Sequence, residues 1–138
     1  MKIDLALLAE KASQIERHLA RVADRLPERA EDFKPSTDTS DAVILHLWMA
    51  VQAAIDLALS SCVQRKLGAP ATYADAFRAL AGDGVLDREL ADRLTRASGF
   101  RNLVAHAYEG IDLVRVHAIA CTGPADLRAF LAALRDAR

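Results

Sequence analysis

Hydrophobic positions return at helical spacing along most of the chain. Over residues 3–26 apolar side chains recur every three or four positions, which predicts an amphipathic helix that Pro27 should weaken near its end. A second helix is predicted after the polar turn "FKPSTDTS", running to about Lys66. Its N-cap is expected among Thr39, Ser40 and Asp41.

Capping signals mark two further helices in the middle of the chain. Thr72, followed three residues later by Asp75, resembles a capping box before the short segment "YADAFRAL". Asp87 is expected to cap a longer helix over residues 88–108, which Gly110 closes.

The C-terminal part predicts two more helices. Asp112 should cap "LVRVHAIAC", and the Gly123–Pro124 pair should break the chain before "ADLRAFLAALRDAR". No stretch alternates apolar and polar residues as a half-buried strand does. The expected fold is therefore all-α: one domain over residues 1–138, an up-and-down four-helix bundle with additional short helices.

The second predicted helix is apolar on every side, where a surface helix would show one apolar stripe. It is expected to form the centre of the bundle and also to be covered by a second copy of the chain. Polar side chains interrupt it at His46, Gln52 and Asp56, which argues against a membrane span.

Composition limits the functional classes. Of 138 residues, 52% are hydrophobic and the net charge is −1, whereas a general nucleic-acid coat protein would be strongly basic. Any nucleic-acid binding must be local; residues 96–138 hold six basic and four acidic residues. The N-terminal sequence lacks a signal-type apolar run, so a cytoplasmic location is expected. Cys62 and Cys121 are expected to be reduced core thiols, with no metal-ligand spacing.

The stretch "SGFRNLVAHAYEGID" carries the candidate chemistry. At ~100° per residue, Arg101, Asn102, His106 and Tyr108 fall within an arc of ~140–150° near the end of one helix. A histidine moves protons near neutral pH, and a guanidinium binds phosphate oxygens as a rigid fork. RNA cleavage without a metal needs these two groups. A structural interpretation is also open, because cationic residues stabilise the last turn of a helix.

The segment "FRNLVAHAY" resembles the Rx4HxY signature of the HepT-like toxins, within the HEPN superfamily of small helical RNA-cleaving domains. The similarity extends to "AVQAAIDLA", to "LGAPATYADAFRALAGDGVLDRELADRL" and to "YEGIDLVRVHAI", and covers most of residues 40–120.

This resemblance implies a HEPN-like fold and a homodimer whose motif helices form one composite cleft. It implies RNA cleavage without metal or other cofactor, with transfer RNA among the substrate types. His106 would be the acid–base group, Arg101 would bind the scissile phosphate and Asn102 would help to position them. The implied partner is a minimal nucleotidyltransferase antitoxin that attaches AMP to Tyr108 and blocks the cleft.

Two questions stay open at the level of sequence. Asp56, expected to be buried, either bonds to a neighbouring helix or subunit, or supports the site by pairing with Arg101 or orienting His106. The second question is the function itself. The alternative to an endoribonuclease is a non-catalytic helical subunit that binds nucleotide or docks a nucleotidyltransferase.

Overall fold

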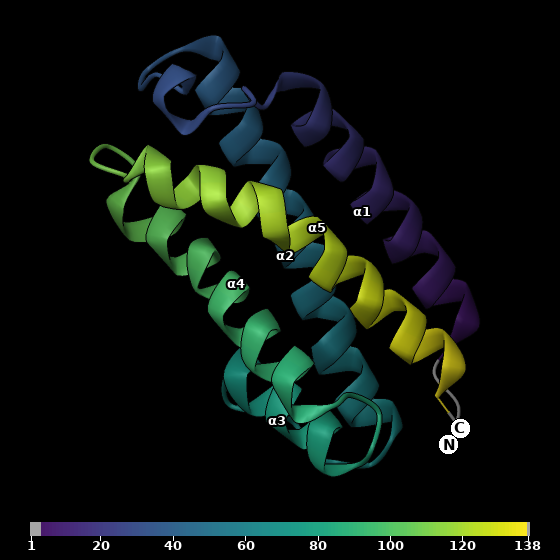
Figure 1. Ribbon diagram of the computed structural model, residues 1–138. Coiled ribbons are helices and arrows are strands. Elements are labelled where there is room, and N and C mark those ends of the chain that lie inside the picture. The colour runs from purple at the N-terminus through teal and green to yellow at the C-terminus, as the bar shows by residue number, and fades with distance from the viewer. Residues whose placement is uncertain (1–3, 138) are drawn as a thin grey trace.

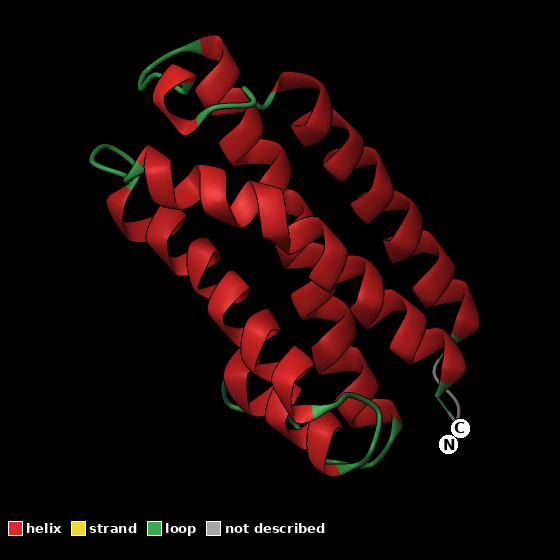
Figure 2. Cartoon of the chain, viewed as in Figure 1, coloured by secondary structure: helices red, strands yellow, loops and turns green. Residues whose placement is uncertain are grey.

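The computed structural model describes residues 4–137, and within this range every regular element is helical (Figure 2). The elements are α1 (Leu5–Arg25), the 3₁₀ turn η1 (Ala30–Asp32), α2 (Asp38–Gln64), α3 (Tyr73–Gly82), α4 (Arg88–Ala107) and α5 (Leu113–Asp136). Four long helices lie lengthwise as a bundle, with a short helix at one end, where α1 also begins and α5 ends (Figure 1). The predicted all-α bundle is confirmed.

Local capping determines where the helices begin. Asp87 accepts a hydrogen bond from the Leu90 N–H at 2.7 Å at the start of α4, and Asp112 caps α5, as predicted. The predicted cap of α2 is wrong. Thr37 is the N-cap: its hydroxyl accepts from the Ser40 N–H at 3.0 Å, while the Ser40 hydroxyl accepts from the Thr37 N–H at 3.1 Å. This reciprocal pair starts the helix before Thr39.

The first helix ends where the sequence predicts. α1 stops at Arg25, two residues before Pro27, and its first described turn is capped by Asp4. The predicted start at Ile3 lies outside the described residues.

The predicted break at Gly123–Pro124 is wrong, because α5 continues through Pro124 to Asp136. A proline inside a helix lacks the N–H that would bond the carbonyl four residues earlier, here that of Ala120. Packing on both sides of the proline holds the helix together: Val116 and Leu127, on opposite sides of it, are both buried. Tertiary contacts therefore override the local signal.

Two hydrophobic clusters fill the bundle along its length. One lies around α3 and includes Phe77 and Phe130, whose rings meet edge to face at 5.6 Å. The other lies at the far end around Phe33 and Phe100. α2 contributes side chains to both clusters, which explains why it is apolar on all sides. Its length and composition would also suit a membrane span, but here its apolar residues form the centre of the bundle.

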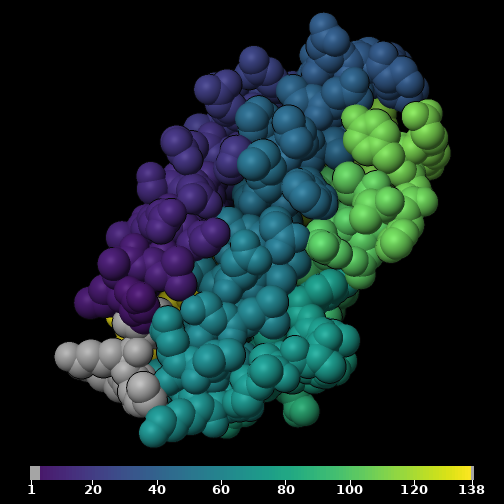
Figure 3. All heavy atoms as spheres, turned by 180° about the vertical axis from the view of Figure 1, so that it is seen from behind, coloured from purple at the N-terminus to yellow at the C-terminus, as the bar shows by residue number. Residues whose placement is uncertain are grey.

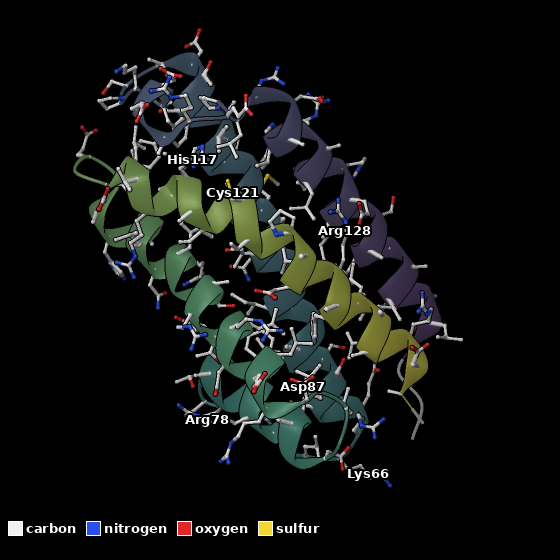
Figure 4. The ribbon with its side chains drawn as sticks, viewed as in Figure 1. Lys66, Arg78, Asp87, His117, Cys121 and Arg128 are labelled. Atoms are coloured by element: carbon white, nitrogen blue, oxygen red, sulfur yellow. The ribbon has the colours of Figure 1, made fainter. Side chains whose placement is uncertain are left out.

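Polar contacts tie α5 to the N-terminal part of the chain. Arg128 makes a two-point ion pair with Glu16 of α1 at 2.9 and 3.1 Å, and the His117 Nε2 donates to the Pro27 carbonyl at 2.7 Å (Figure 4). Cys121, one turn after His117, is exposed, so the prediction of two core thiols holds only for Cys62.

Candidate functional site

Arg101 of α4 is held by a side chain of α2. Its Nε donates to Gln52 Oε1 at 2.8 Å, and Gln52 Nε2 donates to Asp56 Oδ1 at 3.0 Å. Asp56 Oδ2 in turn lies 3.6 Å from Lys11 Nζ of α1. Gln52 and Asp56 lie one turn apart on α2 and so share a face. The polar chain Lys11–Asp56–Gln52–Arg101 thus connects three helices and orients the guanidinium.

Asn102 also contacts the guanidinium of Arg101. Its Oδ1 accepts from Arg101 Nη1 at 3.4 Å, a weak contact, and its Nδ2 donates to the Tyr73 hydroxyl of α3 at 2.9 Å. Arg101 also lines an opening of about 360 Å³ between α2, α4 and the start of α3. No hydrogen bond is made by Arg101 Nη2 to residues 4–137, so its N–H groups remain available to an anion.

His106 lies in the last turn of α4 and is exposed. Its imidazole makes no hydrogen bond or ion pair with the described residues, and none joins it to Arg101. Five residues of helix place it ~140° around the axis and ~7.5 Å along it from Arg101. The imidazole is therefore open to solvent.

Tyr108 is the C-cap residue of α4, and its hydroxyl bonds to α2 rather than to Arg101. Its hydroxyl donates to Asp41 Oδ1, in the first turn of α2, at 2.5 Å. This hydrogen bond raises the pKa of Tyr108 to about 12, and partial burial and the negative charges of Asp41 and Glu109 act in the same direction. The phenol is therefore held neutral at physiological pH.

An apolar surface lies beside Tyr108. Seen from behind, α2 runs as a central stripe between α1 and the C-terminal end of α4 (Figure 3). On this stripe Leu45 and Met49 are 51% and 39% exposed, next to a shallow apolar hollow of about 430 Å³. We call this surface the α2–α4 face; its residues are Ile44, Leu45, Trp48, Met49, Val104 and Tyr108.

The structure brings together only some of the residues singled out from the sequence. Arg101 and Asn102 are in contact, whereas no hydrogen bond between described residues joins His106 or Tyr108 to either of them. The side chain of Asp56 is 44% exposed, so the expectation that it is buried is wrong. Asp56 is connected to Arg101 through Gln52 and does not contact it directly. Among residues 4–137, no group of three or more His, Cys, Asp or Glu side chains could hold a metal ion.

Sequence reasoning missed three contributors, Gln52, Tyr73 and Asp41. Gln52 had a visible signal, because two polar residues one turn apart in an apolar helix have to find partners. Tyr73 and Asp41 had no such signal in the sequence, since each is an ordinary residue at the start of a helix and its partner lies far along the chain.

The fold and the polar motif on α4 define the class of protein, a HEPN-type helical bundle. The structure matches that of a tri-AMPylated HEPN toxin of Shewanella oneidensis, solved in complex with an MNT antitoxin. The TM-score is 0.86 at 27% identity, covering 95% of this chain and 98% of the other. YutE, a cytosolic Bacillus subtilis protein of unknown function, shares the fold with a TM-score of 0.81 at 15% identity, over 98% of this chain and 91% of its own.

The family follows from the sequence comparison. The profile described as Ribonuclease HepT-like matches residues 15–134, and the chain belongs to this family. The mRNA nuclease HepT of Shewanella oneidensis is 30% identical over 114 residues, which is 82% of this chain and 85% of the relative. The resemblance inferred from "FRNLVAHAY" is therefore confirmed.

Proposed function

We propose that this protein is the toxin of a toxin–antitoxin pair and a metal-independent endoribonuclease whose catalytic residues are Arg101 and His106. The observation that carries the proposal is the state of these two side chains. Arg101 is fixed by Gln52 and Asn102 beside an opening, and His106 stands free on the same helix. The curated relative is described as an mRNA nuclease, which supports RNA as the substrate.

His106 and Arg101 have different roles in the proposed reaction. His106 accepts the proton of a ribose 2′-hydroxyl as its oxygen attacks the adjacent phosphorus. The free N–H groups of Arg101 bind the phosphate oxygens as negative charge develops on them. The bond between phosphorus and the 5′-oxygen breaks, the leaving oxygen takes up a proton from water, and a cyclic phosphate remains on the other fragment. Asn102, Gln52 and Asp56 are positioning residues for the guanidinium in this scheme.

The active form in this proposal is a homodimer formed through the α2–α4 face. Leu45 and Met49 expose large apolar side chains there, and contiguous apolar exposure of this kind marks interaction surfaces. A second copy would bring its own motif helix to the same face, since Val104 and Tyr108 of α4 belong to it. The two motif helices would then line one cleft.

Neutralisation in this proposal is a covalent modification of Tyr108. A minimal nucleotidyltransferase antitoxin attaches AMP to the phenol, which is 41% exposed. The Shewanella oneidensis toxin that shares the fold is AMPylated and bound to its MNT antitoxin, which supports the same partner here. An added nucleotide is bulky and anionic, so on the α2–α4 face it would hinder RNA from reaching the cleft.

One observation favours the alternative, a non-catalytic subunit that binds nucleotide or docks a nucleotidyltransferase. The surroundings of the motif carry the carboxylates Asp41, Asp56 and Glu109 in a chain of net charge −1, and negative charge opposes RNA binding.

Cleavage of RNA in EDTA decides between the two functions. Purified protein and its His106→Ala variant are compared on messenger and transfer RNA, after intact-mass measurement shows that Tyr108 is unmodified. Cyclic-phosphate ends produced by the wild type and lost in the variant would support the nuclease. Absence of cleavage by unmodified, dimeric wild type would favour the docking subunit.

A further inference from the structure

We propose that Asp41 is the proton acceptor and positioning residue for nucleotidyl transfer to Tyr108. This inference rests on the proposed modification of Tyr108 and assigns a part of that reaction to the toxin itself. The Tyr108 hydroxyl donates to Asp41 Oδ1 at 2.5 Å, so the nucleophilic oxygen already directs its proton at a carboxylate. Both side chains are exposed in the single chain, and Tyr108 has to stay at the edge of the proposed dimer face for a partner enzyme to reach it.

The fold creates this contact from distant parts of the chain. Asp41 lies in the first turn of α2 and Tyr108 at the end of α4, 67 positions later. The N-terminal end of a helix stabilises negative charge, which favours a carboxylate at this position. Asp41 makes no other side-chain hydrogen bond or ion pair with residues 4–137, so its carboxylate is not committed elsewhere.

The chemistry requires such an acceptor. Phenolate is scarce at neutral pH even at the ordinary tyrosine pKa of 10, and the hydrogen bond to Asp41 raises the pKa of Tyr108 to about 12. As the Tyr108 oxygen bonds to the α-phosphorus of ATP, its proton passes to Asp41 Oδ1. The bond from the α-phosphorus to the oxygen that bridges to the β-phosphate breaks, and pyrophosphate leaves with that electron pair. Asp41 afterwards releases the proton to water.

The space beside the two residues fits this role. A hollow of about 380 Å³ between the start of α2 and the α4–α5 turn is lined by Ser40, Asp41, Tyr108 and Glu109, among others. Small-molecule sites span about 300–1,000 Å³, so a nucleotide can approach the hydroxyl there. The lining contains two carboxylates and neither Lys nor Arg, so the phosphate charge has to be met by the nucleotidyltransferase. Asp41 therefore handles the proton and does not bind the triphosphate.

The chain offers a matched control for the test. Asp38 lies in the same first turn of α2, is exposed, and makes no side-chain hydrogen bond or ion pair with the described residues. The unmodified protein and its Asp41→Asn, Asp41→Glu, Asp38→Asn and Tyr108→Phe variants are incubated with ATP and the cognate nucleotidyltransferase. Addition of AMP is followed by intact mass from pH 5 to 9, and RNA cleavage by each unmodified protein is measured in parallel.

Asp41→Asn is expected to slow AMP addition on the order of 100-fold or more, which is the usual effect of losing a positioned acid or base. The wild-type rate should depend little on pH, because its proton acceptor is part of the protein, whereas the rate of Asp41→Asn should rise with pH as phenolate forms. Glu109, the other carboxylate that raises the pKa of Tyr108, remains in both proteins. Asp41→Glu should restore part of the rate of AMP addition, and Asp38→Asn should be modified, and should cleave RNA, at the wild-type rates.

The outcomes separate the two proposals. If the wild type gains no AMP, or if Tyr108→Phe gains as much, the proposed modification of Tyr108 is wrong. If the wild type is modified at Tyr108 and Asp41→Asn matches its rate, Asp41 has no part in the transfer. A slower Asp41→Asn with an unchanged pH profile would overturn its role as proton acceptor.

Discussion

Gln52 accepts a hydrogen bond from Arg101 Nε at 2.8 Å and donates one to Asp56 at 3.0 Å. The amide therefore connects the guanidinium of α4 to a carboxylate one turn along α2, without placing two opposite charges in direct contact. A direct ion pair would occupy the N–H groups of Arg101, whereas this arrangement leaves Nη2 without a partner among the described residues. The contact positions the arginine and leaves part of its guanidinium available to an anion, as the proposed role of Arg101 requires.

Replacing Gln52 by leucine tests this arrangement. Leucine has a similar volume but neither donor nor acceptor, so Arg101 loses its positioning contact. Misplacement of a catalytic group by about 1 Å can cost about 100-fold in rate. We expect RNA cleavage by Gln52→Leu to fall about 10- to 100-fold, while the free energy of unfolding changes by no more than about 1.5 kcal/mol.

The same substitution at Gln64 provides the control. Gln64 lies at the other end of α2, where it accepts from the Asp4 N–H at 2.9 Å and donates to the Ser60 hydroxyl at 3.3 Å. Gln64→Leu should cleave RNA at the wild-type rate. Unimpaired cleavage by Gln52→Leu would show that the polar chain does not contribute to activity.

Charge on the α2–α4 face should separate the proposed dimer. Leu45 and Met49 are already exposed in one copy, so the double variant Leu45→Arg/Met49→Arg should fold with unchanged helical content. Like charges facing each other across a two-fold interface oppose association. We expect light scattering to show a monomer, with RNA cleavage lost.

Val63→Arg is the matched control for the dimer, because Val63 is 60% exposed near the other end of α2. It should remain dimeric and active. Persistence of the dimer in the double variant, or cleavage by its monomer, would contradict the proposed interface.

The His18–His46 contact predicts loss of stability in acid. The two Nδ1 atoms lie 3.0 Å apart, so one ring donates and the other accepts. Burial lowers the pKa of both groups, and nearby arginines lower them further, Arg21 acting on each. A lowered folded-state pKa stabilises the fold above the unfolded value of 6.5, and this stability is lost as the pH falls through the folded value.

Denaturation of His46→Gln at pH 7.5 and 5.0 checks this prediction. Both rings are partly exposed, so we expect this pair to lower the free energy of unfolding of the wild type by less than about 1 kcal/mol between pH 7.5 and 5.0. The variant should lose less than the wild type over the same interval, because its amide cannot be protonated. The carboxylates and the other histidines are common to both proteins. Identical losses would show that the pair does not affect stability.

Replacing Pro124 by alanine should stabilise α5. Alanine restores an N–H donor to the Ala120 carbonyl, and it is about 3 kcal/mol more favourable than proline inside a helix. Part of this gain is offset because proline also restricts the unfolded chain. We expect urea unfolding to show a gain of about 1–2 kcal/mol. Pro70→Ala, in the α2–α3 connection, should give no gain. A lower midpoint for Pro124→Ala would mean that the bundle is adapted to the proline ring.

Much of the fold was readable because its signals are local. Apolar spacing predicted α1, and Asp87 and Asp112 cap the helices that they were expected to cap. Such contacts join residues at most four apart, so they depend on little beyond the nearby sequence. The failure at Thr37 was also local, since a stronger neighbouring capping box moved the start of α2. At Pro124, by contrast, tertiary packing overrode the predicted break.

The motif residues could be named from the sequence, but their partners could not. A helix of known period determines that Arg101, Asn102, His106 and Tyr108 share one side of α4. Gln52 and Asp41 meet α4 from 49 and 67 positions away. Those contacts depend on how α2 and α4 are rotated and offset against each other, which the two hydrophobic clusters decide together. The sequence by itself thus determined the chemical groups and the helix that carries them. Only tertiary packing decided that Gln52 would hold the arginine and Asp41 the tyrosine.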